Sequence, residues 1–447
     1  MRAGRVGIRL VGISVLAVTV ATSGGLATAT RGGAAAPTPT YQVEDLGTLD
    51  GDYASAAMGI NQRGDVVGWS MGPNGTRAFV YTDASGMTAL PALAGRPVTT
   101  ARAVNDDGVA VGTAATGGSD IGHAVRWKSG GATDLGTLDT GLFSEANGIN
   151  AAGVIVGSSY TDGGSALGIH AFQYDDTAGL VDLTPATDNA RAEAINELGQ
   201  VTGWRNGHAF RRTGTTFTDL GVAPGFGSSF GVAINDAGQV AGHVITASGN
   251  SEQIFRYTDA DRMVILGGSG ELNRASGINS AGDVVGWGRP DLGLKQGFLF
   301  TDGDGMRGLN SLIDPAAGWF VLGAGDINDA GQIAGWASGP SGHRAVRLTH
   351  SNVNAPPAAP SALSASVLSR SRVRLNWADN SANETGFRID RSVGTHARFV
   401  LLAKVGADTT SYTDRTGTAG QAYRYRIRAF NATGPSAWSE PVTVVTG

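Results

Sequence analysis

The stretch Ile60-Asn61-Gln62-Arg63-Gly64-Asp65-Val66-Val67-Gly68 contains the motif that decides the fold. An asparagine after Ile or Val is followed by glycines three and seven residues later. This N-x-x-G-x-x-x-G motif occurs seven times, beginning at Asn61, Asn105, Asn150, Asn196, Asn235, Asn279 and Asn328. Successive copies lie 44, 45, 46, 39, 44 and 49 residues apart. A period near 45 predicts a repeat architecture.

One unit, residues 54–93, contains four short β-rich runs separated by turn residues, without helical periodicity. The asparagine side chain can bond the backbone of its own turn, and glycine supplies positive φ. Four residues before it stand only small residues: Ala57, Ala101, Ala146, Ala192, Gly231, Ala275 and Ala324. This predicts a first strand crowded against its neighbours. Asn206-Gly207 predicts a two-residue type I′ hairpin. Four strands per unit of this length predict the blade of a β-propeller.

The two ends of the repeat region complement each other. Tyr41–Leu49 (YQVEDLGTL) is similar to the fourth run of other units, as at 132–139, and the last unit ends after its third run at His343–Leu348. We therefore expect these two segments to pair and close a ring of seven blades, which removes the open edges of the array. An open solenoid of seven units is the alternative.

The third run of several units opens with His-Ala-Phe, at 170–172 and 208–210, and in weakened form at 123–125, 77–79 and 253–255. In this the chain resembles the bacterial extracellular HAF-repeat family over about two-thirds of its length. The resemblance implies secretion and a propeller-like fold, and it implies no activity.

Residues 1–29 have the pattern of a signal peptide: three arginines, an apolar run over 10–21, and a cleavage site at Ala27-Thr28-Ala29. We expect an extracellular protein with a disordered leader (30–40), a seven-unit HAF-repeat β-propeller (41–350) and a Pro/Ala linker (351–361). Cleavage changes the formal charge from −5 to −8. An acidic chain disfavours nucleic acid and anionic membranes as partners, and no later run predicts stable membrane insertion. The absence of cysteine excludes disulfides and thiolate metal sites.

Residues 362–447 resemble a fibronectin type III domain. Trp377 and the run from Tyr423 to Asn431 (YRYRIRAFN) carry the resemblance, which extends to Pro360, Gly434 and Ser436. It implies a β-sandwich with Trp377 in the core and Tyr423 as the tyrosine corner. Such modules are mostly spacers or binding units.

Several motifs match a catalytic, metal-binding or other functional pattern, but we prefer to interpret each of them as a structural element. The G-x-S-x-G match at 227–231 lacks the strand-to-helix context of a nucleophile elbow. His123, His170 and His208 recur at one place in separate units, so we expect strand-end hydrogen bonds rather than a shared metal site. Residues 302–305 are similar to the start of a calcium-binding loop, but we expect them to form a hairpin turn. We expect Arg63-Gly64-Asp65 to be an ordinary turn of the repeat. Tryptophans recur after the last glycine of the motif, which indicates packing between units: Trp69, Trp204, Trp287 and Trp336.

Residues that the repeats do not share are the candidates for ligand contact. They are Trp319, Phe320, Tyr160, Arg205 and Arg289. Trp319 and Phe320 could alternatively fill a gap in the last unit. No catalytic residue, cofactor or metal ligand is predicted.

Two classes of function remain. We prefer a secreted, non-enzymatic binding or interaction protein: a monomer whose partner is an extracellular polysaccharide or protein, with the fibronectin-like module as spacer. The alternative is an accessory protein or glycosidase of extracellular polysaccharide degradation. A glycosidase needs two converging carboxylates about 5–10 Å apart, and no unique pair stands out among the repeated acids.

Overall fold

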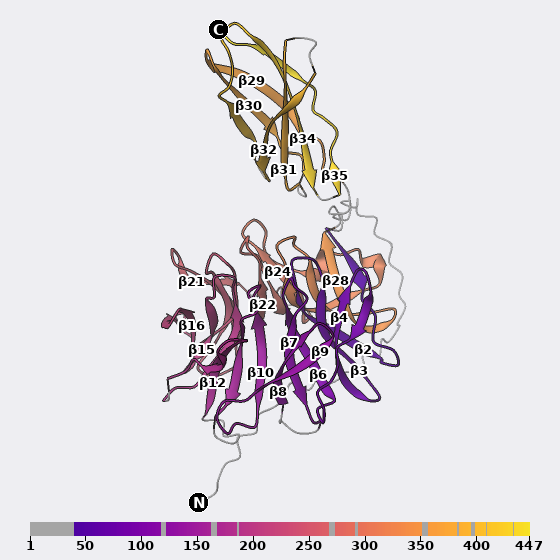
Figure 1. Ribbon diagram of the computed structural model, residues 1–447, viewed down its shortest axis with the longest axis vertical. Coiled ribbons are helices and arrows are strands. Elements are labelled where there is room, and N and C mark those ends of the chain that lie inside the picture. Colours follow the sequence, from indigo (N-terminus) through magenta and orange to yellow (C-terminus); the bar gives the residue numbers. More distant parts are fainter. Residues whose placement is uncertain are drawn as a thin grey trace, which may run out of the picture. The chain divides into compact units, whose positions relative to one another are not determined.

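The computed structural model describes residues 40–117, 122–161, 168–185, 187–267, 273–290, 294–350, 356–381, 384–394, 398–407, 409–431 and 433–447. Within these ranges the chain is almost entirely β (Figure 1), and helix is limited to the 3-10 turns η1 (Leu309–Ser311) and η2 (Pro315–Ala317). The predicted all-β class is confirmed. The predicted signal peptide, nearly all of the leader and residues 351–355 of the linker lie outside the described residues.

The described residues between 41 and 350 form seven antiparallel sheets of four strands each. The first strands are β2 (Ala54–Ile60), β6 (Val98–Val104), β10 (Ser144–Ile149), β14 (Ala190–Ile195), β18 (Ser228–Ile234), β22 (Arg274–Ile278) and β26 (Phe320–Ile327). The second strands are β3 (Val66–Gly72), β7 (Ala110–Ala115), β11 (Ile155–Tyr160), β15 (Val201–Arg205), β19 (Val240–Ile245), β23 (Val284–Gly288) and β27 (Ile333–Gly339). The third strands are β4 (Gly75–Thr82), β8 (Gly122–Lys128), β12 (Ile169–Asp175), β16 (His208–Thr213), β20 (Glu252–Thr258), β24 (Gln296–Thr301) and β28 (Gly342–His350). The fourth strands are β5 (Gly86–Ala89), β9 (Gly131–Gly136), β13 (Gly179–Asp182), β17 (Thr216–Gly221), β21 (Arg262–Gly267), β25 (Gly305–Gly308) and β1 (Tyr41–Asp45).

The last sheet takes its fourth strand from the beginning of the repeat region. Strand β1 pairs antiparallel with β28, with Tyr41 opposite His350 and Asp45 opposite Val346. The predicted pairing is confirmed, although the strand ends at Asp45 rather than Leu49. Leu46 and Leu49 are buried in a core that combines residues of the first and last sheets.

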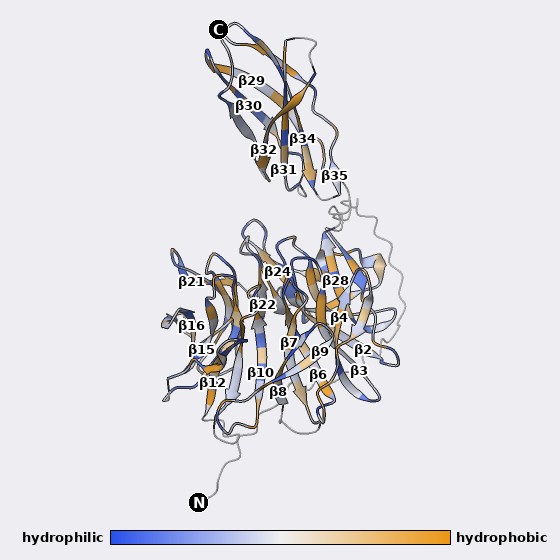
Figure 2. Cartoon of the chain, viewed as in Figure 1, coloured by the Kyte–Doolittle hydropathy of each residue, from blue (hydrophilic) through white to orange (hydrophobic). Residues whose placement is uncertain are grey.

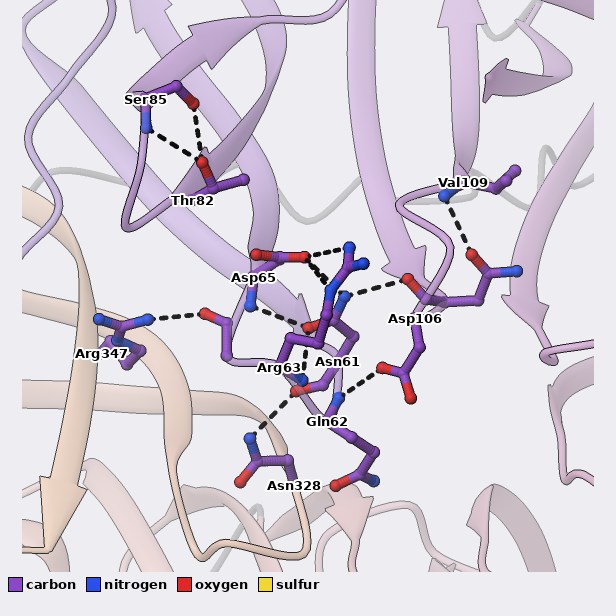
Figure 3. A network of polar contacts seen from close by, with 12 residues as sticks. Asn61, Gln62, Arg63, Asp65, Thr82, Ser85, Asp106, Val109, Asn328 and Arg347 are labelled. Atoms are coloured by element: carbon purple, nitrogen blue, oxygen red, sulfur yellow. Dashed lines mark hydrogen bonds and ion pairs between the residues drawn. The ribbon is translucent and has the colours of Figure 1, made fainter. Parts of the chain in front are cut away.

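The asparagine turns link each sheet to the next (Figure 3). Asn61 Oδ1 accepts hydrogen bonds from the Asp65 and Arg63 main-chain N–H groups, and its Nδ2 donates to Asn105 O at 3.0 Å. Equivalent Nδ2 bonds to the next asparagine carbonyl start at Asn105, Asn150, Asn196 and Asn235. The sixth and seventh sheets are joined by Ser280 N–H and Asp329 Oδ1 at 2.8 Å. The asparagine is therefore a turn residue and a link between sheets at once.

The first strands contact one another in order, and β26 contacts β2 as well as β22. The first and second strands approach each other closely: a Cβ at Gly68 of β3 would lie 2.0 Å from Ala56 O, so glycine is required at that position. Ala57, opposite Gly68, is fully buried, as the sequence predicts. Figure 2 shows hydrophobic residues along the strands, and the core clusters combine residues of successive sheets.

Residues 361–445 form a two-layer sandwich. One layer contains β29 (Ser361–Ser369), β30 (Arg372–Ala378) and β33 (Ser411–Asp414). The other contains β31 (Gly386–Val393), β32 (Val400–Gly406), β34 (Ala422–Asn431), β35 (Gly434–Pro435) and β36 (Val442–Val445). Trp377 lies in the core between them, and Tyr423 Oη accepts a 2.8 Å hydrogen bond from the Thr418 N–H. Both predicted aromatic roles are confirmed.

Candidate functional site

The five predicted contact residues lie at one end of their sheets. We call this end the loop edge: it is where second strands end and third strands begin, opposite the asparagine turns. Tyr160 and Arg205 are the last residues of β11 and β15, and Arg289 directly follows β23. Phe320 begins β26 opposite Ser338, and Trp319 precedes it. The residues nevertheless belong to four different sheets, so the structure does not gather all five into one site.

Trp319 is packed into the last sheet. Its ring lies over Gly339 so closely that a Cβ there would be 2.2 Å from the Trp319 ring, and the side chain packs against that sheet's core. Phe320 beside it is half-buried. This placement favours the alternative in which both aromatics fill a gap, and ligand contact by them stays a prediction.

Tyr160 and Arg289 are each held by one neighbouring segment. The Tyr160 ring lies 5.4 Å from the Phe143 ring between centroids. Residues 162–167, which follow Tyr160 closely in the chain, lie outside the described residues. Arg289 is exposed, and its main-chain N–H donates to Asn273 Oδ1 at 2.7 Å.

Arg205 lines a cavity of about 380 Å³ at the loop edge of the fourth sheet. The other lining residues are Asn206, His208, Ala209, Phe210, Phe217 and Asp219. The cavity forms beside the predicted Asn-Gly hairpin, where Asn206 and Gly207 have φ of 51° and 87°. These two positive φ values fit a type I′ turn, which confirms the hairpin and explains why Arg205 and His208 are adjacent across it.

An ion pair and a histidine–aspartate hydrogen bond fix the polar groups of this cavity. Arg205 Nε donates to Asp188 Oδ2 at 2.7 Å, and the guanidinium lies 5.1 Å from the Phe217 ring centroid. His208 Nδ1 and Asp219 Oδ2 are 2.9 Å apart. The cavity thus combines an aromatic ring with a guanidinium, an imidazole and a carboxylate whose positions are set before any ligand arrives.

The pKa is lowered both for Asp219, which lines this cavity, and for Asp188, which pairs with Arg205. Hydrogen bonds from Asn206 and Arg205 lower the pKa of Asp188. Burial alone would raise the pKa of Asp219, but hydrogen bonds from His208 and the Gly221 N–H outweigh it and lower the pKa. A glycosidase acid needs a raised pKa, so these groups are suited to accept hydrogen bonds rather than to donate a proton.

The histidine–aspartate pair recurs in two preceding sheets. His123 Nδ1 lies 2.8 Å from Asp134 Oδ2, and His170 Nδ1 lies 2.6 Å from Asp182 Oδ2. The predicted strand-end hydrogen bonds are confirmed. Across the described ranges, no cluster of three or more His, Asp or Glu could hold a metal ion.

The remaining motifs have structural roles. Ser229, in the G-x-S-x-G match, is buried in β18, where its Oγ donates to Gly221 O and accepts from the Ala209 N–H. Asp302 lies in the turn between β24 and β25 and pairs with Arg256 at 2.7 Å. Arg63 pairs with Asp65 within its own turn (Figure 3).

A group of polar residues on the first strands is absent from our predicted candidates. Arg102, Asn147 and Glu193 stand three residues before their asparagines, and Glu145 and Arg191 stand five before. Three residues before the asparagine the other repeats have Met58, Val232, Ser276 or Gly325, so the large polar residues at this position are a signal that was available in the sequence.

The sandwich carries a basic aromatic surface on β34. The Arg426 and Arg428 guanidinium carbons lie 3.9 and 4.4 Å from the Trp438 ring centroid, and Arg426 also lies over Phe399. Asp390 pairs with Arg426 and Arg388, so part of this charge is neutralised.

Comparison with protein families identifies residues 358–445 as a fibronectin type III domain. Exoglucanase B of Cellulomonas fimi is 27% identical over 301 residues, covering 62% of this chain and 25% of that protein. The chain thus spans about a quarter of the length of this curated relative. Among solved structures, an Fn3-like protein from Clostridium thermocellum has 23% identity and a TM-score of 0.18, and the match covers 20% of this chain and 92% of that chain. FN3tt has 18% identity and a TM-score of 0.18, with 21% and 99% covered.

In the part of the chain that the structure describes, no helix combines the length and apolar character needed to cross a membrane.

Proposed function

We propose that this chain is a secreted, non-enzymatic carbohydrate-binding protein built on a closed seven-bladed β-propeller of the HAF-repeat type. The observation that carries the proposal is the loop-edge cavity, which is lined by the Phe217 side chain together with Arg205, His208 and Asp219. Sugars are bound by aromatic faces together with a few fixed polar groups. The partner would be an extracellular polysaccharide, with a glycoprotein as the alternative source of the same sugar.

The propeller is our inference from three features. There are seven sheets of four strands, the first strands contact one another in order with β26 beside β2, and β1 completes the last sheet. We assign the boundaries of the sequence prediction: signal peptide 1–29, leader 30–40, propeller 41–350, linker 351–361 and fibronectin type III spacer 362–447. Secretion rests on the signal pattern and on the presence of a fibronectin type III domain.

The second candidate is an accessory protein or glycosidase of extracellular polysaccharide degradation. The name of the Cellulomonas fimi relative favours it. The lowered pKa of Asp188 and of Asp219 argues against catalysis at the loop-edge cavity, because neither carboxyl would supply a proton near neutral pH.

The test combines a glycan array, pull-down on insoluble polysaccharides and a reducing-sugar assay with the mature protein. We expect binding without sugar release, and at least about tenfold weaker binding in Arg205→Ala. Arg126→Ala is the matched control, because Arg126 also lies over an aromatic ring, that of Tyr174 at 5.6 Å, but in another sheet.

Released sugar would establish the glycosidase instead. Binding that is equal in Arg205→Ala and in the wild type, but is lost when residues 351–447 are removed, would assign carbohydrate binding to the fibronectin type III domain.

A further inference from the structure

Five polar side chains gather on three consecutive first strands. Arg102 on β6, Asn147 on β10 and Glu193 on β14 each occupy a position that the strand register skips, as in a β-bulge. A bulge residue is released from the ladder, so its side chain can be directed independently of the pleat. In the other sheets this position holds Met58, Val232, Ser276 and Gly325. The polar group is therefore confined to one sector of the repeat region.

Glu145 holds the two arginines of this group in place. It is 3% exposed, and its Oε2 accepts a hydrogen bond from Arg102 Nη2 at 3.0 Å. Its Oε1 pairs with Arg191 and accepts from Ser158 Oγ at 3.1 Å. Since both Glu145 oxygens are engaged, this carboxylate serves as a fixed anchor rather than as a contact for a ligand.

Asn147 carries an acceptor that the protein does not satisfy. Its side chain is 9% exposed, and Nδ2 donates to Ala192 O at 2.9 Å. Its Oδ1 is buried without a hydrogen-bond partner. A buried acceptor without a donor is unfavourable, so this oxygen is suited to a donor supplied from outside the chain.

Arg102 supplies a cation on the neighbouring first strand, β6. Its side chain keeps 41% of its accessible surface, although the surrounding protein desolvates it and thereby lowers its pKa. Desolvation likewise lowers the pKa of Arg191. Burial lowers the pKa of both guanidiniums by more than the Glu193 carboxylate raises it, so a further anion would stabilise their charged form.

Glu193 is the third bulge residue of this group and lies on the next first strand, β14. Its Oε1 lies 3.6 Å from Arg191 Nε, and its side chain is 24% exposed. Along β6, β10 and β14 the bulge residues therefore present a cation, an unpaired amide oxygen and a carboxylate in that order.

We propose that Arg102, Asn147 and Glu193 form a binding site for a small hydroxy carboxylate, such as a uronate. The ligand carboxylate pairs with the Arg102 guanidinium, the geometry that arginine favours for carboxylates. Ligand hydroxyls donate to Asn147 Oδ1 and to the Glu193 carboxylate. This site is separate from the cavity at Arg205 and requires neither the propeller closure nor the proposed function.

The test is isothermal titration calorimetry of the mature protein with three probes. D-glucuronate carries the carboxylate and the hydroxyls, D-glucose lacks the carboxylate, and acetate lacks the hydroxyls. We expect D-glucuronate to bind at least about tenfold more tightly than either other probe. Equal affinity for all three, or no measurable binding of D-glucuronate, would overturn the proposal.

Variants assign any binding to these side chains. Arg102→Gln should weaken D-glucuronate binding at least about tenfold, while Glu145 keeps its bonds to Arg191 and Ser158. Arg211→Gln is the matched control, since Arg211 is also ion-paired, to Asp259 at 2.7 Å, but lies in another sheet. Asn147→Ala and Glu193→Gln, checked by thermal unfolding, provide the same comparison if Arg102→Gln does not fold. Unchanged affinity for D-glucuronate in the folded variants would exclude the site. That result would leave the proposed carbohydrate binding at Arg205 untouched, because the Arg205→Ala pull-down tests it separately.

Discussion

Asn328 Nδ2 donates a 3.0 Å hydrogen bond to the main-chain oxygen of Asn61, which lies 267 residues earlier in the chain. The same type of bond joins neighbouring units elsewhere in the repeat region. The last unit is therefore bonded to the first in the way that other units are bonded to the next one along the chain. Arg347 Nη1 adds a second link, to Gly64 O at 2.8 Å (Figure 3). The first and last sheets are thus joined by side-chain bonds as well as by the pairing of β1 with β28.

Deleting residues 41–50 should destabilise all seven sheets together. The deletion removes β1, the buried side chain of Tyr41, and Leu46 and Leu49 from the shared core. We expect a loss on the order of several kcal/mol. Calorimetric melting of the mature chain measures it, with exposed Gln42→Ala on the same strand as control. An unchanged transition would show that β1 does not close the repeat region.

Removing the Tyr423 hydroxyl should weaken the sandwich. The hydroxyl accepts from the Thr418 N–H at 2.8 Å, and Tyr423 is 3% exposed, so Tyr423→Phe leaves this N–H without its acceptor and the hydroxyl's place in the corner empty. We expect a loss of about 1–3 kcal/mol, measured by urea unfolding of residues 358–447. Thr418→Ala is the control because it keeps the N–H. A segment without β-sheet circular dichroism would contradict independent folding of this domain.

Trp319→Ala should change stability more than binding. The ring covers Gly339 and contacts the core of the last sheet, so its loss should cost about 1–3 kcal/mol. Gly339→Ala should also destabilise, because the added methyl would meet the ring. In the double variant the two losses should not add, which a double-mutant cycle measures. Additive losses would mean that the two residues do not contact each other.

Most of the fold could be predicted from the repeat motif. The hydrogen-bonded turn at Asn61 and the close approach of two strands at Gly68 are local requirements, and each copy of the motif repeats them. The order of the strands within a sheet, and the pairing of β1 with the last sheet, could therefore be predicted from the sequence. The candidate sites follow less well. Arg205 could be found because it interrupts the repeat, whereas its cavity depends on Asp188 and Phe217 packing around it. Arg102 and Asn147 stand out in the repeat alignment, but they were missed because the bulge that lets a large polar side chain occupy a crowded strand becomes visible only in the strand register.

Asp326 should make the stability of the repeat region depend on pH. It is the one residue with a carboxylate two positions before a motif asparagine. Its Oδ1 accepts from the Ile327 N–H at 2.8 Å, and its Oδ2 accepts from the Ile60 N–H of the first sheet at 3.3 Å. Burial raises its pKa to about 7, against the lowering effect of these two hydrogen bonds.

Because the pKa of Asp326 is raised in the folded protein, ionisation opposes folding. Below the unfolded pKa of about 3.9 the carboxyl is protonated in both states and has no such effect. Stability should fall as the pH rises from there to about 7, by roughly 2–4 kcal/mol in total. Asp326→Asn cannot ionise, so its gain in melting temperature over wild type should be larger at pH 8 than at pH 4. Asp314→Asn, at an exposed carboxylate outside this junction, is the control. An equal difference between Asp326→Asn and wild type at both pH values would show that Asp326 does not titrate in this range.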